Sequence, residues 1–127
     1  MIVQVVKHPE SQVNIISYSI AKPSNPTKRN YIVYTIRLRT LNDSSPPLFI
    51  QKRFSDFLRL HHRLSSAYPE FEFQSSVFQR GYHAYSKRFD PHFLNYRKYV
   101  LEQFLIIVEK HKDAIYHPAM SEFLISQ

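Results

Sequence analysis

The sequence of 127 residues contains no cysteine and a single glycine. Without cysteine, the chain has no disulfide bond, thiolate metal site or cysteine nucleophile, and it is compatible with a reducing compartment. One glycine is too few for a glycine-rich loop that cradles phosphates. The sequence shows no signal-peptide pattern, and no apolar run reaches the ~20 residues that a membrane span requires. We therefore expect a soluble, intracellular protein.

Acidic residues are scarce relative to basic ones. Lysine and arginine together number 17, aspartate and glutamate number 10, and the formal net charge is +7. A positive charge of this size suits a polyanionic partner, such as a nucleic acid, an anionic membrane or a phosphorylated ligand. A solubility bias without any partner is the alternative, and net charge alone does not choose between them.

The N-terminal half is rich in β-branched and aromatic residues, which favour strands. We expect three strands at residues 13–21, 31–41 and 48–54, joined by turns that contain proline, serine and asparagine. Residues 1–12 are either a further short strand or a flexible lead-in. Three strands joined by turns predict an antiparallel β-meander.

Helical periodicity begins after the third strand. Apolar residues at helical spacing predict a helix with Ser55 or Asp56 as its N-cap, ending before Pro69. A longer helix follows, with Asp90 as its N-cap, Pro91 at its first position and lysines at its end. The predicted fold class is therefore α+β, with a small antiparallel sheet packed against three to four helices.

Two further segments complete the single domain that we expect over residues 1–127. Residues 69–89 form a loop of about twenty residues that contains six aromatic residues and the glycine. Loops of this length in a compact domain are usually functional or disordered, and the aromatic content favours a functional role here. A short helix at residues 119–125 closes the chain.

Arg97 lies four residues from both Phe93 and Leu101, on the inward stripe of the long helix. A buried guanidinium costs free energy unless an anion meets it. In a structural interpretation, Arg97 pairs with an internal carboxylate or extends past the edge of the core. In a functional interpretation, it projects into a cleft and holds a ligand.

Arg53 and Phe54 stand where the third strand gives way to the first helix, a place at which the backbone turns and both side chains can line one pocket. The arginine fork matches two phosphate oxygens at once. The ring beside it offers a flat apolar surface suited to a sugar-like ring. Taken alone, the triplet is equally typical of an edge-strand cation beside a core phenylalanine.

Three segments that match one family pattern in the same order favour the functional interpretations. They are "KRFSDF" at 52–57, "RFDPHFLNYRKYVLEQFL" at 88–105 and "HPAMSEFL" at 117–124. From about residue 13 onward, the sequence resembles a phox-homology (PX) domain, and within that family the sorting nexins. The resemblance implies the PX fold and the recognition of phosphoinositides, most often phosphatidylinositol 3-phosphate.

The resemblance also implies roles for single residues. By position, Arg53 is similar to the arginine that grips the 3-phosphate, Phe54 to the aromatic residue that stacks under the inositol, and Arg97 to the arginine that binds the 4- and 5-hydroxyls. These three residues would form one headgroup pocket.

The sequence departs from the family pattern after the first helix. Family members usually carry a proline-rich run there, whose lysine meets the 1-phosphate, whereas this sequence reads "PEFEFQSS" without a lysine. The contact must then come from Arg80, Lys87 or Arg88, or be missing. Arg80 is the first choice because it follows an apolar pair at the expected tip of the loop.

The same loop resembles the family segment that dips apolar side chains into the bilayer. Val77, Phe78, Tyr82 and Tyr85 alternate with cations, and aromatic rings favour the membrane interface. Alternatively, single rings fold back onto the domain.

Other classes of function lack a recognisable pattern. Seven histidines occur, but no His-x-x-x-His pair with an acidic partner, so we expect neither a metal site nor a cofactor. No nucleophile or acid–base set indicates catalysis. Basic charge with aromatic residues also suits nucleic acids, but the sequence carries no nucleic-acid-binding signature.

We therefore expect a non-enzymatic PX domain that binds phosphatidylinositol 3-phosphate on endosomal or vacuolar membranes, as a peripheral protein on the cytoplasmic side, with other trafficking proteins as further candidate partners. The alternative is a PX fold used mainly for protein–protein docking, with a weak or different phosphoinositide preference.

Overall fold

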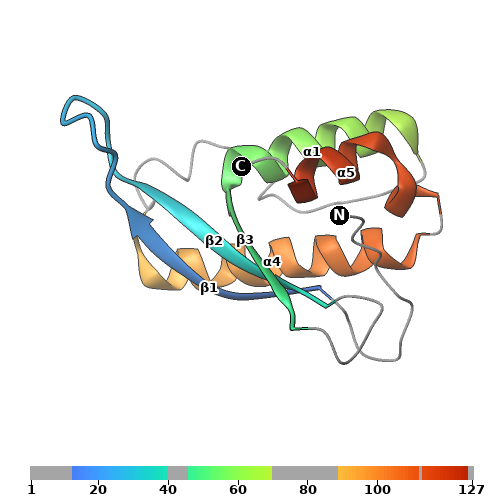
Figure 1. Ribbon diagram of the computed structural model, residues 1–127, viewed down its shortest axis with the longest axis horizontal. Coiled ribbons are helices and arrows are strands. Elements are labelled where there is room, and N and C mark those ends of the chain that lie inside the picture. The colour runs from blue at the N-terminus through green and yellow to red at the C-terminus, as the bar shows by residue number, and fades with distance from the viewer. Residues whose placement is uncertain (1–12, 40–45, 70–88, 112, 126–127) are drawn as a thin grey trace.

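The computed structural model describes residues 13–39, 46–69, 89–111 and 113–125. Three strands come first and helices follow, as predicted for an α+β domain (Figure 1). The elements are β1 (Val13–Ala21), β2 (Tyr31–Leu38), β3 (Leu48–Arg53), α1 (Phe54–Ala67), α4 (Pro91–Lys110), the 3-10 helix η1 (Ala114–Tyr116) and α5 (Pro118–Ile125).

The strands form one antiparallel sheet in the order β1-β2-β3, which confirms the predicted meander. The register places Tyr34 of β2 opposite Lys52 of β3, and Val33 opposite Arg53. Residues that lie directly opposite each other share a face of the sheet, whereas successive residues of one strand point to opposite faces. Lys52 and Arg53 therefore belong to opposite faces of the sheet. A bulge at Ile16 shifts the register between β1 and β2.

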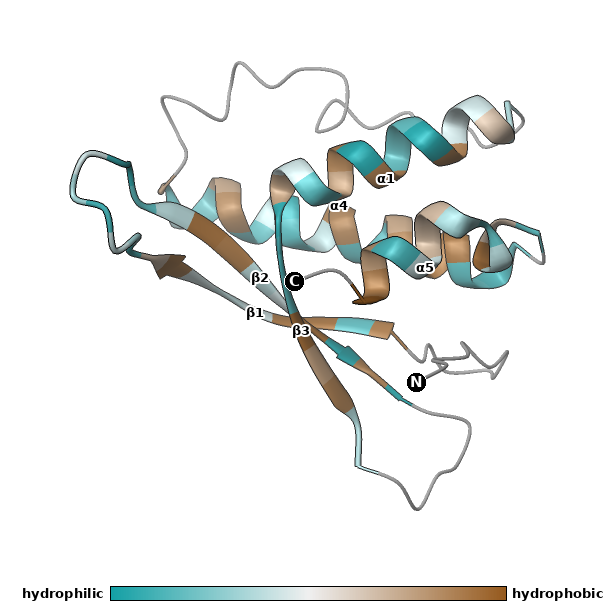
Figure 2. Ribbon diagram, turned by 45° about the horizontal axis from the view of Figure 1, so that its top comes forward, coloured by the Kyte–Doolittle hydropathy of each residue, from teal (hydrophilic) through white to brown (hydrophobic). Residues whose placement is uncertain are grey.

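One face of the sheet packs against the helices. Figure 1 shows α1 and α5 beside each other and α4 running along β1, in agreement with the contacts between these elements. In Figure 2 hydrophobic and hydrophilic residues are interspersed along each helix, as expected when one side of the helix faces the core. The core includes these fully buried side chains: Tyr34, Ile36, Leu38, Phe57, Leu64, Leu101, Phe104, Leu105 and Val108.

The first helix starts earlier than predicted. Arg53, not Ser55 or Asp56, is the N-cap, with extended φ and ψ of −91° and 163°. The Asp56 carboxylate accepts a hydrogen bond from the Arg53 backbone N–H at 2.8 Å. Aspartate therefore stabilises this helix from the third helical position, as the acidic half of a capping box does. Phe54 becomes the first helical residue, and the backbone of Arg53 is fixed.

Two contacts position α4, which carries Arg97. The Asp90 side chain accepts a hydrogen bond from the His92 backbone N–H at 2.9 Å, which confirms Asp90 as the N-cap. Farther along, the Glu102 carboxylate accepts a hydrogen bond from the Ile15 N–H at 2.7 Å. Because β1 is an edge strand, this bond satisfies an edge donor and fastens α4 to the sheet.

The C-terminal segment is held by two histidines, His111 and His117. His111 Nδ1 accepts from the Ala114 N–H at 3.0 Å, and His117 Nδ1 accepts from the Ala119 N–H at 3.0 Å. The Tyr68 ring lies 5.0 Å from the His111 ring and 5.9 Å from the His117 ring, measured between centroids. These imidazoles cap η1 and α5 and join them to the end of α1.

Candidate functional site

Arg97 is a buried cation in contact with two aromatic rings. Only 5% of the residue is exposed. Its guanidinium carbon lies 3.8 Å from the centroid of the Phe54 ring and 4.5 Å from that of the Phe93 ring. Its Nε atom is buried without a hydrogen-bond partner, and no carboxylate within the described residues pairs with the guanidinium. The internal salt bridge of the structural interpretation is therefore not formed in this part of the chain.

Tyr34 is a buried polar residue close to Arg97. Burial raises the pKa of Tyr34 to about 12, although the positive charge of Arg97 opposes this shift. Burial also lowers the pKa of Arg97, and the nearby Tyr34 opposes that change. The Tyr34 hydroxyl is close enough for this mutual effect, yet it makes no hydrogen bond of standard geometry. Since an arginine side chain stays protonated in proteins, Arg97 keeps a positive charge that no acid of the described residues neutralises.

Arg53 is exposed and lies against a different ring. Its guanidinium carbon is 4.0 Å from the centroid of the Tyr31 ring, and no carboxylate of the described residues pairs with the guanidinium. Tyr31 reaches this place because Val33 lies directly opposite Arg53, which puts Tyr31 diagonally across on the same face. A ring over the planar face of a guanidinium leaves its N–H edges available for an oxygen-rich ligand.

Phe54 connects the two arginines. It follows Arg53 in the chain, and its partly buried ring touches the guanidinium of Arg97. The junction of β3 with α1 and the N-terminal half of α4 thus bring together all three predicted pocket residues that the structure describes. The other predicted residues lie outside the described residues: Arg80, Lys87 and Arg88 for the headgroup, and Val77, Phe78, Tyr82 and Tyr85 for membrane insertion.

Three aromatic residues of this site were not predicted, namely Tyr31, Tyr34 and Phe93. The sequence indicated only that Phe93 lies on the inward face of the long helix, without a role at the site. Tyr31 contacts Arg53 because of the register between β2 and β3, and Tyr34 lies near Arg97 of α4, a helix distant from β2 in the sequence. A single sequence specifies neither arrangement. The available signal was the position of the two tyrosines at the start of an aromatic-rich strand, ahead of the Arg53 junction.

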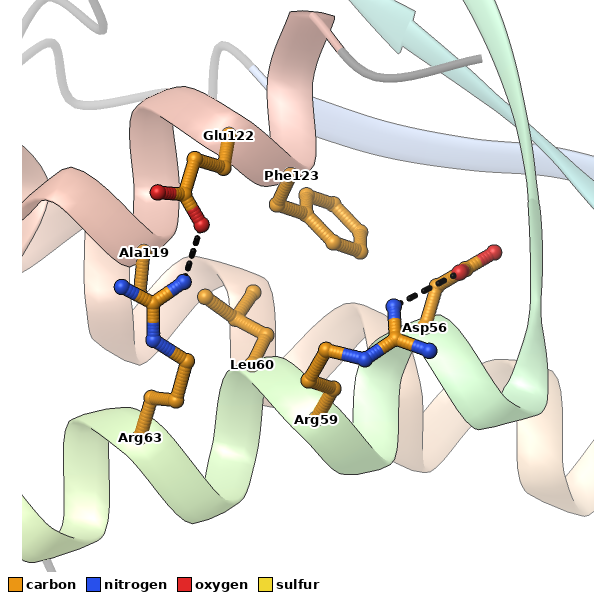
Figure 3. A pocket seen from close by; sticks show the side chains of 7 residues that line it. All are labelled: Asp56, Arg59, Leu60, Arg63, Ala119, Glu122 and Phe123. Atoms are coloured by element: carbon orange, nitrogen blue, oxygen red, sulfur yellow. Dashed lines mark hydrogen bonds and ion pairs between the residues drawn. The ribbon is translucent and has the colours of Figure 1, made fainter.

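A separate hollow of about 280 Å³ lies between α1 and α5 (Figure 3). Leu60, Ala119 and Phe123 form its apolar part, and two ion pairs stand at its rim. Arg59 pairs with Asp56 at 3.4 Å, and Arg63 pairs with Glu122. None of the three predicted pocket residues that the structure describes lines this hollow.

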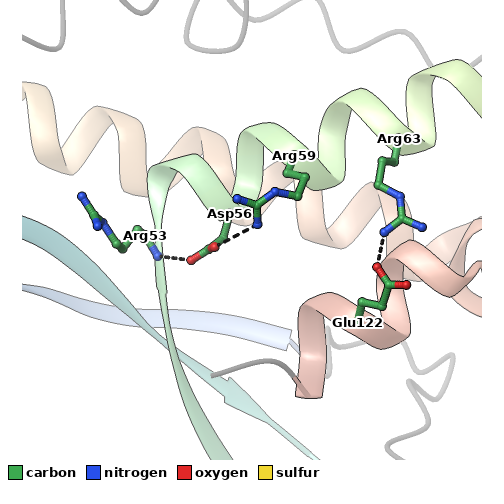
Figure 4. A network of polar contacts seen from close by, with 5 residues as sticks. All are labelled: Arg53, Asp56, Arg59, Arg63 and Glu122. Atoms are coloured by element: carbon green, nitrogen blue, oxygen red, sulfur yellow. Dashed lines mark hydrogen bonds and ion pairs between the residues drawn. The ribbon is translucent and has the colours of Figure 1, made fainter.

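Among the described residues, the arginines of α1 thus differ from Arg53 and Arg97 in having acidic partners. Figure 4 shows the Arg53 guanidinium pointing away from Asp56, to which only its backbone N–H is bonded. Lys52 belongs to the opposite face, where it is buried with its Nζ 5.3 Å from the centroid of the Phe123 ring. Burial lowers the pKa of Lys52. Lys52 and Arg53 therefore lie in different environments, and only Arg53 belongs to the candidate site.

Comparisons with known proteins agree with this architecture. The family model described as "PX domain" matches residues 41–127. The solved structure titled "X-ray structure of a designed CISK-PX domain" superimposes with a TM-score of 0.68 at 23% sequence identity, over 87% of this chain and 95% of that chain. No curated protein matches the sequence. Because the family model covers more than half of the chain and the fold agrees with it, this protein belongs to the PX domain family.

Proposed function

We propose that this protein binds phosphatidylinositol 3-phosphate and thereby recruits its carrier, a protein of the sorting-nexin type, to endosomal or vacuolar membranes. PX domains are in general non-catalytic modules that bind phosphoinositides and associate peripherally with membranes. Among the described residues, no helix is both long and apolar enough to cross a bilayer. The specific lipid and the membrane are the proposal.

The observation that carries the proposal is the environment of Arg97. Removing a charged group from water costs several kcal/mol, and a buried carboxylate or other acceptor usually offsets this cost. The structure provides Arg59 and Arg63 with acids on the surface, where such pairs contribute little. In the described part of the chain, Arg97 contacts two aromatic rings and pairs with no acidic residue. Acceptors from a ligand would complete the set of hydrogen bonds.

The geometry suits a headgroup with a single phosphate. Arg53 would grip the 3-phosphate because it is exposed and no carboxylate of the described residues pairs with its guanidinium. Phe54 would support the inositol ring, and Arg97 would donate to the 4- and 5-hydroxyls. Because Arg97 is 5% exposed and Arg53 is exposed, we assign the uncharged hydroxyls to Arg97 and the phosphate to Arg53. This is why we favour the 3-phosphate over more highly phosphorylated lipids.

The long loop would add the remaining contacts. Arg80, with Lys87 and Arg88 as alternatives, would replace the missing lysine at the 1-phosphate. Val77, Phe78, Tyr82 and Tyr85 would insert into the interfacial region of the bilayer. These assignments rest on the sequence alone, because residues 70–88 lie outside the described part of the chain.

Vesicle flotation with a panel of phosphoinositides tests the proposal. The panel compares the 3-, 4- and 5-monophosphates at equal charge, with wild type, Arg53→Ala and the control Arg59→Ala. Arg59 is a suitable control because it is exposed, lies on α1 and already pairs with Asp56. We expect selective flotation with the 3-phosphate, loss in Arg53→Ala and retention in Arg59→Ala. Equal flotation with all three isomers would contradict the proposed pocket.

Protein docking is a second candidate, favoured by the hollow between α1 and α5 with its apolar Leu60 and Phe123. In that case the domain would reach its membrane through a bound partner. Membrane recruitment in cells that is unchanged by Arg53→Ala would support docking over lipid recognition.

A further inference from the structure

The outer side of α4 carries a row of large uncharged side chains. Tyr96, Tyr99 and Ile107 are 52%, 60% and 46% exposed. Together with the partly exposed Gln103 they follow one another at steps of three, four and four residues, which places them on one side of the helix. Arg97 is buried on the side that faces the core. We call the four residues Tyr96, Tyr99, Gln103 and Ile107 the α4 stripe.

The composition of the α4 stripe is unusual for the solvent side of a helix, which normally carries charged residues. The helix α1 follows the usual pattern, because its exposed Arg59 pairs with Asp56. Between positions 95 and 107 of α4, by contrast, none of the fully exposed side chains is charged. Tyrosine enrichment and a lack of charge are typical of the centre of a protein–protein interface. The α4 stripe is therefore a candidate interaction surface.

The apolar surface continues from α4 onto the sheet. The Glu102 carboxylate accepts a hydrogen bond from the Ile15 N–H at 2.7 Å, which fixes α4 against the edge strand β1. Ile16, the next residue of β1, is 46% exposed. Because Tyr99 precedes Glu102 by about one helical turn, Ile16 extends the α4 stripe on the side of β1.

A second copy of this chain is the partner that best matches the charge of the α4 stripe. The chain carries a formal net charge of +7, so two copies repel each other unless uncharged surfaces meet. An acidic peptide, a nucleic acid or an anionic bilayer gains affinity from cations, which the stripe does not offer. In a dimer with two-fold symmetry, the same uncharged surface of each copy faces the other.

The order of residues in the α4 stripe suits two antiparallel copies. Tyr96 and Ile107 stand at the ends of the stripe, with Tyr99 three residues and Gln103 four residues inside them. A two-fold axis at the centre of the stripe would therefore bring Tyr96 of one copy to Ile107 of the other. It would likewise bring Tyr99 to Gln103, whose amide is a hydrogen-bond partner for a phenol hydroxyl. The exposed Lys110 residues would then lie roughly 25 Å apart along the helices, well beyond the screening length of about 8 Å.

We propose that this protein forms a reversible antiparallel dimer through the α4 stripe. We expect two half-exposed tyrosines and one isoleucine per copy to bury less than the ~1,200–2,000 Å² of a stable interface, so the dimer is weak in solution. On a shared membrane, the higher local concentration favours the dimer. Dimerisation does not depend on the lipid, whereas its consequence, two headgroup pockets on one bilayer, rests on the proposed function.

Sedimentation equilibrium between roughly 10 μM and 1 mM, the affinity range of weak complexes, tests the dimer. The average mass of wild type should rise from 15.2 kDa towards twice this value, and Tyr99→Lys should remain a monomer. Phe49→Lys is the matched control, because Phe49 is 55% exposed on β3, at the sheet edge opposite β1, and should dimerise like wild type. A monomeric wild type at the highest concentration, or an unchanged dimer in Tyr99→Lys, would overturn the proposal. Weaker vesicle binding of Tyr99→Lys beside a monomeric wild type would instead identify the stripe as a membrane contact.

Cross-linking tests the antiparallel arrangement, because the chain contains no cysteine that would interfere. A mixture of Tyr96→Cys and Ile107→Cys should form a disulfide-linked dimer under mild oxidation. Each variant alone should not, since equal positions of antiparallel copies lie roughly 16 Å apart, beyond the ~7 Å reach of a disulfide. Cross-linking of either variant alone to the level of the mixture would contradict the arrangement.

Two further measurements make these results specific. Equal thermal midpoints of all variants verify that the substitutions leave the fold intact. Arg53→Ala should dimerise like wild type, so its loss of lipid binding tests the pocket independently of the dimer. Conversely, a monomeric wild type that still binds the 3-phosphate selectively would reject the dimer and leave the proposed function in place.

Discussion

Replacing Arg97 with methionine removes the guanidinium and keeps an unbranched side chain in the same space. If Arg97 serves a ligand, its burial is a cost to the free protein that the fold tolerates. Methionine removes that cost, and its thioether still packs against Phe54 and Phe93, the rings that now contact the guanidinium. We therefore expect a loss of phosphoinositide binding without a loss of stability.

The expected change in the free energy of unfolding of Arg97→Met follows from two opposing contributions. Burying the cation costs several kcal/mol, because Arg97 is 5% exposed and its Nε lacks a hydrogen bond. Cation–π contacts with the two rings return about 1–2 kcal/mol each. Methionine should therefore leave the free energy of unfolding unchanged or raise it by about 1–2 kcal/mol. For a domain of this size, such a gain raises the thermal midpoint by roughly 3–10 °C.

Thermal unfolding and vesicle binding of the same preparation measure both effects. The matched control is Arg63→Met on α1, whose surface ion pair with Glu122 contributes about 0–1 kcal/mol. Arg63→Met should change neither the thermal midpoint nor vesicle binding greatly. A decrease of about 2 kcal/mol or more in the free energy of unfolding of Arg97→Met would show that Arg97 stabilises the fold and is not held at a cost for a ligand. Normal lipid binding by a folded Arg97→Met protein would equally refute a role of Arg97 in ligand binding.

Two further predictions concern the tyrosines of the site. Tyr31→Leu removes the ring that supports Arg53 at 4.0 Å and should weaken phosphoinositide binding by about 2- to 30-fold, which corresponds to a cation–π contact of 0.5–2 kcal/mol. Tyr31→Phe keeps the ring and should bind like wild type, so an equal loss in both variants would rule out this role of the ring. Burial raises the pKa of Tyr34 from 10.0 to about 12, and a raised pKa favours the protonated form in the folded state. The resulting stability is fully present below pH 10 and is lost as the pH rises through about 12. Tyr34→Phe should remove this alkaline loss in urea-unfolding measurements, and an identical pH profile in the variant would contradict the assignment.

The arrangement of strands and helices was largely predictable, because local signals and long-range packing agree. The β-branched and aromatic composition predicted β1 over its observed bounds, and Asp90 with Pro91 predicted the start of α4. The predicted start of α1 was wrong because aspartate is favoured both as the N-cap and at the third helical position. Here Asp56 acts from the third position. Spacing alone does not distinguish these two placements.

The candidate site was predictable only in part. The four-residue spacing from Phe93 and Leu101 indicated that Arg97 faces inward, and its 5% exposure confirms this. Its lack of an acidic partner within the described residues was not predictable, because that depends on which distant segments meet. The same is true of Tyr31, which contacts Arg53 through a strand register that the sequence does not specify. The roles of the loop residues remain predictions.

The central claim is that Arg53 and Arg97, both without an acidic partner in the described part of the chain, form a pocket that reads an inositol phosphorylated at position 3 alone. Calorimetric titration with short-chain phosphatidylinositol 3-, 4- and 5-phosphate tests it most directly, because soluble ligands of equal charge remove the contribution of the membrane. We expect the 3-phosphate to bind at least roughly tenfold more tightly than the other two, a difference of about 1.4 kcal/mol, and we expect Arg53→Ala to lose this preference. Equal affinity for the three isomers, or an unchanged preference in Arg53→Ala, would contradict it.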